Sequence, residues 1–222
     1  VTRSLADGAH TLDLSRNDRE AGIYAELTYD RPQRLMVVAG IRADRHFAPH
    51  KRTYVTPRAH LKWHLSGRAT LRLSAGLGHR LASPVSENPG ILADGRRLVV
   101  ITDDTGTLRG AHGIERALTA GGSITQTFVL GRDHNASLSA DYFYTDLSHS
   151  TVVDTEMHPD EIWVYGLHGG NRSHTWQADF NWQPAERLDV LATARFTHSR
   201  LRLPRPDGTA YVGERPLLSR FK

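Results

Sequence analysis

The sequence predicts an all-β fold, an antiparallel up-and-down meander that forms part of a transmembrane β-barrel. Three observations support this prediction. Apolar and polar residues alternate with a period of two in eight segments, whereas helical periodicity is poor throughout. Short and long connections alternate between these segments. The longest apolar run, from Leu35 to Ile41, has seven residues, so the roughly 20 apolar residues of a membrane helix are missing.

Each alternating segment is expected to form one strand with an uncharged face and a polar face, because neighbouring strand residues point to opposite sides of a sheet. In the fourth segment, for example, Leu71 and Leu73 belong to the uncharged face and Arg72 and Ser74 to the polar face. The eight segments are 21–29, 35–43, 59–65, 69–77, 118–128, 136–144, 176–182 and 188–196.

Turn-forming residues make up every second connection. These short turns are Asp30–Arg34, Ser66–Arg68, Leu130–His134 and Gln183–Arg187. The other connections have about 12, 37, 30 and 20 residues and follow Asp44, Gly78, Thr145 and Thr197. Alternate connections of a meander lie at the same end, so we expect all short turns at one end of the sheet and all long loops at the other.

Two architectures fit this alternation. In a soluble sandwich or a lipocalin-like barrel the apolar face points inward to a core. In an outer-membrane barrel it points outward to lipid, and the polar face lines the lumen. The expected strand length of about 9–11 residues and the separation of turns from loops favour the membrane barrel. Aromatic residues near the short-turn end also favour it, as an interfacial belt. They are Tyr29, Trp63, Phe128 and Trp182.

The composition narrows the function classes. The chain has 222 residues, of which 39% are hydrophobic and 23% charged, as in folded domains. It contains no cysteine, which excludes a disulfide scaffold, a thiolate zinc site and a cysteine nucleophile. The net charge is +4, but basic residues are dispersed among 24 acidic ones, so nucleic acid is not an expected partner.

A series of motifs in the expected order extends over nearly the whole chain. They are Gly22–Tyr29, Arg34-Leu35, Ala39–Asp44, Thr56–Arg58, Leu71–Arg80, Glu87-Asn88, Ala140–Asp146 and Pro216–Lys222. Together they resemble the barrel of TonB-dependent outer-membrane receptors, and the subtype is most similar to receptors of the Bacteroidetes. Two features depart from that pattern. His79 stands where an aromatic residue is usual, and Gly122 and Gln126 weaken the apolar face of the fifth strand.

The resemblance implies a barrel of about 22 strands, of which residues 1–222 supply about eight. The chain is then a fragment of a barrel domain, without the amino-terminal plug domain, the TonB box and the carboxy-terminal strands. The implied function is active transport by a receptor in the bacterial outer membrane. A scarce small molecule, such as a ferric siderophore, cobalamin, haem or similar compound, is captured and imported with energy from the TonB complex, acting through the plug. The implied partners are outer-membrane lipid, the TonB complex and the substrate.

Two other function classes stay open: a porin or adhesin barrel independent of TonB, and a soluble β-sandwich binding module. An enzyme is not expected, because the sequence has no G-x-S-x-G elbow, no H-E-x-x-H motif and no P-loop. No catalytic residue, resident metal or cofactor is predicted. The candidate substrate-binding residues, in the loops and the upper lumen, are Arg42, Arg58, His79, Arg80, Glu87 and Asn88. The loops His79–Ile114 and Leu147–Ser173 are expected to carry most binding determinants.

Three further groups have a functional and a structural interpretation. The row Arg58, His60, Lys62 and His64 is either a basic stripe for an anionic substrate or the plug, or lumen charge paired with acids such as Glu26; pairing is favoured. The His50/Tyr54 loop and His158–Glu161 are either metal ligands or solvated loop residues, and solvation is favoured. Asp103–Gly106 is either part of a calcium loop or a simple turn, and the turn is favoured.

Overall fold

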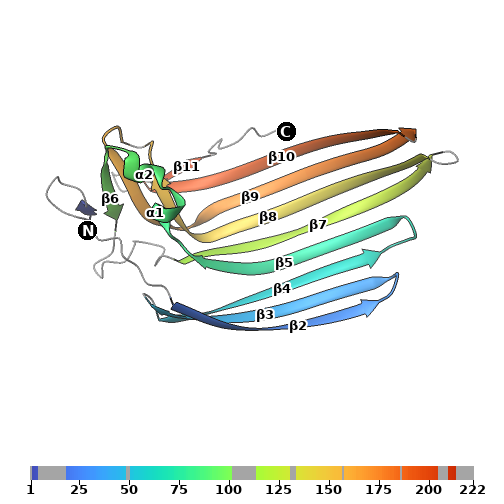
Figure 1. Cartoon of the computed structure of the whole chain (residues 1–222), viewed down its shortest axis with the longest axis horizontal. Coiled ribbons are helices and arrows are strands. Elements are labelled where there is room, and N and C mark those ends of the chain that lie inside the picture. Colours follow the sequence, from blue (N-terminus) through green and yellow to red (C-terminus); the bar gives the residue numbers. More distant parts are fainter. Residues whose placement is uncertain are drawn as a thin grey trace.

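The structure is a computed structural model that describes residues 2–4, 19–48, 51–101, 114–130, 134–156, 158–185, 187–204 and 210–213. Within these ranges the fold is all-β, and the long strands run side by side along the long axis of the molecule (Figure 1). None of the described helices has the length and hydropathy of a membrane-spanning helix. The prediction of an all-β antiparallel meander is confirmed.

Each of eight long strands contains one of the eight alternating segments, apart from Leu65 at the end of the third segment. They are β2 (Arg19–Arg31), β3 (Leu35–Ala48), β4 (Arg52–His64), β5 (Ala69–Leu81), β7 (Ile114–Leu130), β8 (His134–Asp154), β9 (Glu161–Ala185) and β10 (Leu188–Pro204). The sequence pattern did not predict the short elements. They are β1 (Thr2–Ser4), α1 (Pro84–Glu87), α2 (Gly90–Ala93), β6 (Arg97–Ile101) and β11 (Ala210–Gly213).

The long strands follow one another through the sheet in chain order, each antiparallel to its long neighbours. β5 pairs directly with β7, because β6 leaves this order and pairs in parallel with the start of β9. β1 pairs with β6, and β11 pairs with β10. β2 lies at an edge of the described sheet, which is therefore an open wall.

The register separates the sheet into two faces, because residues directly opposite one another in paired strands lie on the same side. Leu73 of β5 lies opposite Leu61 of β4 and Gly122 of β7. One residue earlier, Arg72 lies opposite Lys62 of β4. Apolar positions thus meet apolar positions and polar ones meet polar ones, as the alternation predicts. We call these two sides the apolar face and the polar face.

The apolar face is uncovered in the described part of the chain. Leu27 is 71% exposed, Ile41 is 53% exposed and Leu73 is 46% exposed. Among the described strands, the long ones contact their neighbours in the sheet, and no second layer of these strands packs on either side. The polar face is hollowed: a depression of about 520 Å³ is lined by residues that include Lys62, Arg72 and Asp141.

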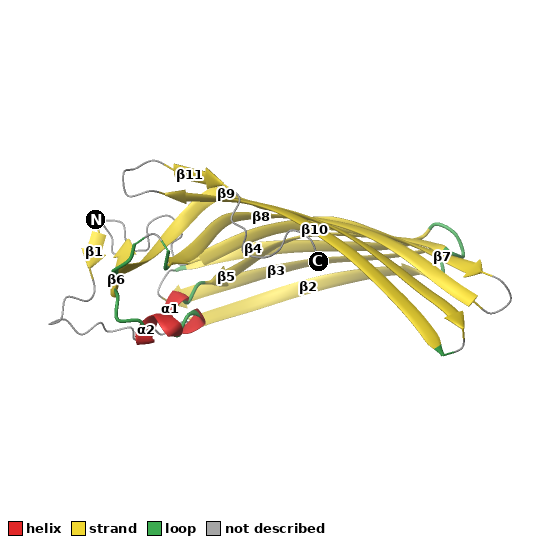
Figure 2. Cartoon of the chain, turned by 90° about the horizontal axis from the view of Figure 1, so that it is seen from above, coloured by secondary structure: helices red, strands yellow, loops and turns green. Residues whose placement is uncertain are grey.

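The connections lie at two opposite ends of the sheet (Figure 1). The turns after β2, β4 and β9 lie at one end, which we call the turn end, and α1, α2 and β6 lie at the loop end (Figures 1 and 2). In the turn after β2, Gln33 adopts a left-handed conformation with φ of 59°. In the turn after β4, the Ser66 hydroxyl accepts hydrogen bonds from the backbone N–H groups of Arg68 and Ala69, at 3.2 and 3.0 Å.

The strands are longer than predicted, and this corrects the expected loops. β8 has 21 residues and β9 has 25, so most of the expected loop Leu147–Ser173 is strand. β3 likewise continues to Ala48 and β4 begins at Arg52, which takes up most of the expected loop after Asp44. The residue pairs that extend β8 and β9 contain β-branched and aromatic residues. These residue types favour strands, even though the sequence does not alternate in this region.

The buried core lies at the loop end and not beneath the long sheet. Val99 of β6, Ile114 of β7, and Ile162 and Val164 of β9 are each at most 2% exposed. β6 pairs with β9 at this end, which brings these side chains together. A buried polar contact also lies there: the Tyr165 hydroxyl donates to Asp154 Oδ2 at 3.1 Å.

Candidate functional site

The six predicted binding residues lie on β3, β4 and β5 and around α1. They are Arg42 (β3), Arg58 (β4), His79 and Arg80 (β5), Glu87 (last residue of α1) and Asn88 (its C-cap). Their contacts divide them into three groups. Arg80, Glu87 and Asn88 gather around α1; Arg42 and His79 share a contact with Asp44; and Arg58 pairs with Glu26.

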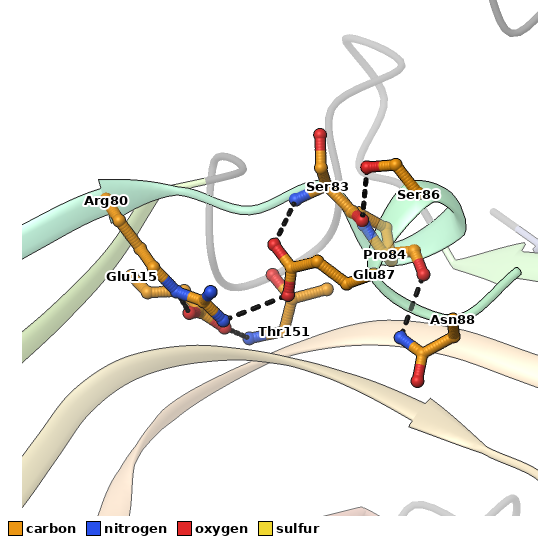
Figure 3. Close-up of polar contacts among 8 residues, drawn as sticks. All are labelled: Arg80, Ser83, Pro84, Ser86, Glu87, Asn88, Glu115 and Thr151. Carbon is orange, nitrogen blue, oxygen red and sulfur yellow. Dashed lines mark hydrogen bonds and ion pairs between the residues drawn. The ribbon is translucent and has the colours of Figure 1, made fainter.

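The group around α1 holds this short helix against β5 (Figure 3). Arg80 Nη2 donates to Glu87 Oε2 at 3.0 Å, and the Ser83 backbone N–H donates to Glu87 Oε1 at 3.1 Å. Asn88 Nδ2 donates to the Pro84 carbonyl oxygen at 2.9 Å. Two predicted binding residues, Glu87 and Asn88, therefore also hold the backbone of α1 in place.

Glu115 of β7 is the second partner of Arg80, and the sequence did not single it out (Figure 3). Arg80 Nε donates to Glu115 Oε2, while the Thr151 backbone N–H donates to Glu115 Oε1 at 2.9 Å. One carboxylate thus joins β5, β7 and β8 at the loop end. The hydrogen bond to Glu115 raises the pKa of Arg80 above its ordinary value, so this guanidinium is permanently charged.

A second group, which we call the histidine cluster, consists of Glu20, Asp44, His46, Tyr54 and His79. Glu20 of β2 lies directly opposite His46 of β3, and Asp44 of β3 lies opposite Tyr54 of β4. The rings of Tyr54 and His79 stack with centroids 4.8 Å apart, and His46 meets Tyr54 edge-on at 5.5 Å. The cluster brings together residues of β2, β3, β4 and β5.

Two backbone features make room for the histidine cluster. A Cβ on Gly22, opposite Asp44, would lie 1.9 Å from Asp44 Oδ1, so only glycine leaves space for this buried carboxylate. The pairing of β4 with β5 runs from His64–Thr70 to Arg58–Gly76, although both strands continue toward the loop end. The stacked rings lie beyond the last pair, beside a cavity of about 250 Å³.

His79 does not follow the alternation of β5, in which odd-numbered residues lie on the apolar face. Its Nε2 lies 3.7 Å from Oδ2 of Asp44, a residue of the polar face. Burial lowers the pKa of His79 below its ordinary value, so the imidazole is neutral at pH 7. The hydrogen bonds from Arg42 Nε to both Asp44 oxygens, each 2.8 Å, lower the pKa of Asp44, which stays ionised.

Arg58 forms the third group. Its Nη2 lies 2.6 Å from Glu26 Oε2, so the favoured prediction of a paired charge is confirmed for Arg58. The two residues are on β2 and β4, and Gly40 of β3 lies opposite both of them. A Cβ on Gly40 would lie 3.0 Å from Arg58 Nε, so the missing side chain lets Arg58 reach across β3.

The other basic residues of the row on β4, His60, Lys62 and His64, have no ion pair among the described residues. His64 Nδ1 lies 3.1 Å from the Thr70 hydroxyl, within hydrogen-bond distance. Lys62 lies opposite Arg72 and lines the same depression as Asp141 and His60. The polar face therefore has positive charge near the middle of the wall, with an acidic residue beside it.

We expect the Glu26–Arg58 pair to depend on Gly40. Both side chains are substantially exposed, so a double-mutant cycle with Glu26→Gln and Arg58→Met should give a coupling of about 0.2–1 kcal/mol. In a Gly40→Leu background the added side chain occupies the path of Arg58, and the coupling should fall to zero. The measurement is the unfolding free energy of each variant; an unchanged coupling in the Gly40→Leu background would contradict this account.

The remaining residues considered as metal ligands in the sequence either have other contacts or lie outside the described ranges. His158 stacks on Trp163 with ring centroids 5.0 Å apart, and Glu161 accepts from Trp163 Nε1 at 2.8 Å and pairs with Arg97. His50 and Asp103–Gly106 lie outside the described residues, as does the motif Pro216–Lys222.

A potential metal-binding group appears where none was predicted. Within the described ranges, one set of three ligand-type side chains has its ligand atoms within 4.8 Å of one another: Glu20, His46 and His79. Sequence reasoning named His79 for substrate binding but missed Glu20 and His46. The usable signal was the even spacing of Asp44 and His46, which places both on the polar face of one strand.

No protein-family model, curated protein or solved structure matches the chain. Its function is therefore inferred from the wall, its two faces and the residue groups at the loop end.

Proposed function

We propose that the chain is part of the wall of a β-barrel in the bacterial outer membrane, in a receptor of the TonB-dependent type that captures a scarce small molecule for active import. One observation carries the membrane part of this proposal: the sheet is a single layer whose apolar face is exposed along its whole width. The family part rests on the motifs from Gly22 to Asp146 and on their order in the chain.

The exposed apolar face needs a cover, because leaving one large aliphatic side chain in water forgoes about 1.5–3 kcal/mol. Soluble monomers rarely expose apolar patches beyond a few hundred Å². The exposed large side chains on this face include Ile23, Leu27, Ile41, Leu73, Leu77, Leu118, Ile124 and Leu138. In an outer-membrane barrel lipid covers this face and no second protein layer is needed.

Aromatic residues support the same orientation. Tyr29, Trp63, Phe128 and Trp182 are all exposed and lie within a few residues of the turn end of their strands. Amphipathic rings at this level form the interfacial girdle of membrane barrels. The turn end then lies at the periplasmic interface, and the loop end, where the strands extend furthest, lies outside the cell.

The polar face supports the transport part of the proposal. In a barrel of about 22 strands the hollow polar face lines the lumen around a plug. Arg42 and His79 lie toward the loop end of this face, and Arg80, Glu87 and Asn88 lie around α1, where a substrate arriving from outside first meets the wall. The resemblance gives the substrate class, a ferric siderophore, cobalamin, haem or similar compound, and the partner, the TonB complex acting through the plug.

Nitroxide scanning tests the membrane part. Residues 1–222 contain no cysteine, so single cysteines placed at 70–77 in the intact protein, with any cysteine outside this sequence replaced by serine, report on one position each. Labels at Leu73 and other apolar-face positions should be most accessible to oxygen, which concentrates in lipid. Labels at Ser74 and other polar-face positions should be most accessible to a water-soluble nickel chelate. Equal accessibility at neighbouring positions, or the inverted pattern, would remove the membrane assignment in favour of a soluble binding module.

The receptor class is tested separately. The intact protein should bind the purified periplasmic domain of TonB, with an amino-terminal truncation as the control. A lipid-facing wall in a protein that does not bind TonB would favour a porin or adhesin.

A further inference from the structure

We propose that Glu20, His46 and His79 form a binding site for a divalent late transition-metal ion such as Zn²⁺. The site belongs to the histidine cluster and lies at the loop end, beyond the apolar segments of β2, β3 and β5. This inference does not rest on the proposed transport function, because it uses contacts within the wall alone.

The distances suit a shared ion. One ligand atom from each of the three side chains lies within 4.8 Å of the other two. Zinc–nitrogen and zinc–oxygen bonds of about 2.0–2.2 Å place tetrahedral ligand atoms about 3.4 Å apart. Closing the difference requires side-chain displacements of up to roughly 1.4 Å. Glu20 and His46 are already directly opposite in the ladder.

Two buried nitrogen atoms lack a partner. The His46 and His79 side chains are 3% and 6% exposed, and His46 Nε2 and His79 Nδ1 have no hydrogen-bond partner among the described residues. A buried polar atom left in this state costs about 1–3 kcal/mol. Metal ligation removes that cost. These two orphaned nitrogens are the strongest indication that the site takes a ligand.

The other nitrogen of the His79 ring faces a carboxylate that is not one of the three proposed ligands: His79 Nε2 lies 3.7 Å from Asp44 Oδ2. The 3.7 Å distance between His46 Nδ1 and Glu20 Oε2 instead joins two of the proposed ligands. In metal sites, a ligating histidine commonly directs its second nitrogen to a carboxylate, which fixes the ring and raises its basicity. Asp44 is buried and held by Arg42, so it has the position of such a supporting residue for His79.

The donor types select the class of ion. Two imidazoles and one carboxylate suit Zn²⁺, Ni²⁺ and Cu²⁺, whereas Ca²⁺ and Mg²⁺ require mainly oxygen ligands. Glu20 supplies a negative charge, and the charge of Asp44 is already matched by Arg42. A bound ion would connect β2, β3 and β5 at the level where β4 and β5 are no longer paired.

Equilibrium dialysis against Zn²⁺, with metal analysis of the intact protein after chelator treatment, tests the site. We expect one tight site in the wild type. His79→Phe keeps a ring against Tyr54 but removes both nitrogens, and it should weaken this site by about 100-fold or more. The matched control is His60→Phe, a histidine of β4 outside the cluster, which should leave the site unchanged.

A second variant keeps the test decisive if His79→Phe does not fold. Glu20 is 41% exposed, so Glu20→Gln should fold normally and still weaken Zn²⁺ binding by about 10- to 100-fold. Excess Ca²⁺ should not displace the ion. A wild type without a tight Zn²⁺ site, unchanged affinity in Glu20→Gln, or release of Zn²⁺ by Ca²⁺ would each overturn the proposal.

Discussion

Leu73→Arg should destabilise the intact barrel by about 2–4 kcal/mol, the cost of an arginine on the lipid face near the bilayer midplane. Leu73 lies near the middle of β5, is 46% exposed, and lies opposite Leu61 and Gly122 on the apolar face. No described layer covers this position, so in the membrane wall proposed above the substituted side chain would meet lipid.

Ser74→Arg is the matched control, one residue further along the same strand. Ser74 lies opposite His60 and Gly121 and lines the depression of the polar face. A guanidinium there keeps its hydration, so we expect a cost below about 1 kcal/mol, as for wetter positions of membrane barrels. The unfolding free energy in denaturant with lipid present, or the folded fraction in a heat-modifiability gel, measures both variants.

Only the assignment of the two faces distinguishes Leu73 from Ser74. Equal destabilisation by the two arginines would indicate that neither side of β5 faces hydrocarbon. A larger effect of Ser74→Arg would mean that the faces are inverted, with the apolar side packed inward. Either outcome would contradict the proposal that the apolar face contacts lipid.

The meander was predictable from the sequence because each long strand contains a segment with a period of two. A one-residue slip would move an entire apolar set to the other face, so the alternation also fixes the register, as the pairing of Leu61 with Leu73 shows. Gly122 seemed to weaken the apolar face, but its Cβ would lie 2.6 Å from Leu73 Cδ2. The glycine makes room for a cross-strand leucine, which a single strand cannot reveal.

The loop end was less predictable, because its contacts join residues far apart in the chain. The extensions of β8 and β9 pair with each other without alternation, so they resembled a loop. The histidine cluster depends on where β4 and β5 stop pairing, which no local pattern encodes. The Glu26–Arg58 pair was predictable because it needed only two polar-face charges on nearby strands.

Glu115→Ala is expected to open the loop end locally. The Glu115 side chain is 14% exposed and accepts from both Arg80 Nε and the Thr151 backbone N–H. Its removal leaves the partly buried Thr151 amide without that acceptor, at a cost of about 1–3 kcal/mol. We therefore expect hydrogen exchange at the Thr151 amide to accelerate by about 10- to 100-fold, as measured by mass spectrometry on peptides from β8.

Two controls separate this anchoring role from a general loss of charge near Arg80. Glu115→Gln keeps a side-chain oxygen for the Thr151 amide and should restore most of the protection. Glu87→Ala removes the other carboxylate bound to Arg80, but that ion pair is more exposed, so it should cost about 0–1 kcal/mol and leave the Thr151 amide protected. Equal loss of protection in Glu87→Ala and Glu115→Ala would mean that α1, and not Glu115, joins β8 to the wall. Fast exchange at Thr151 in the wild type would mean that the hydrogen bond to Glu115 does not hold this end of β8.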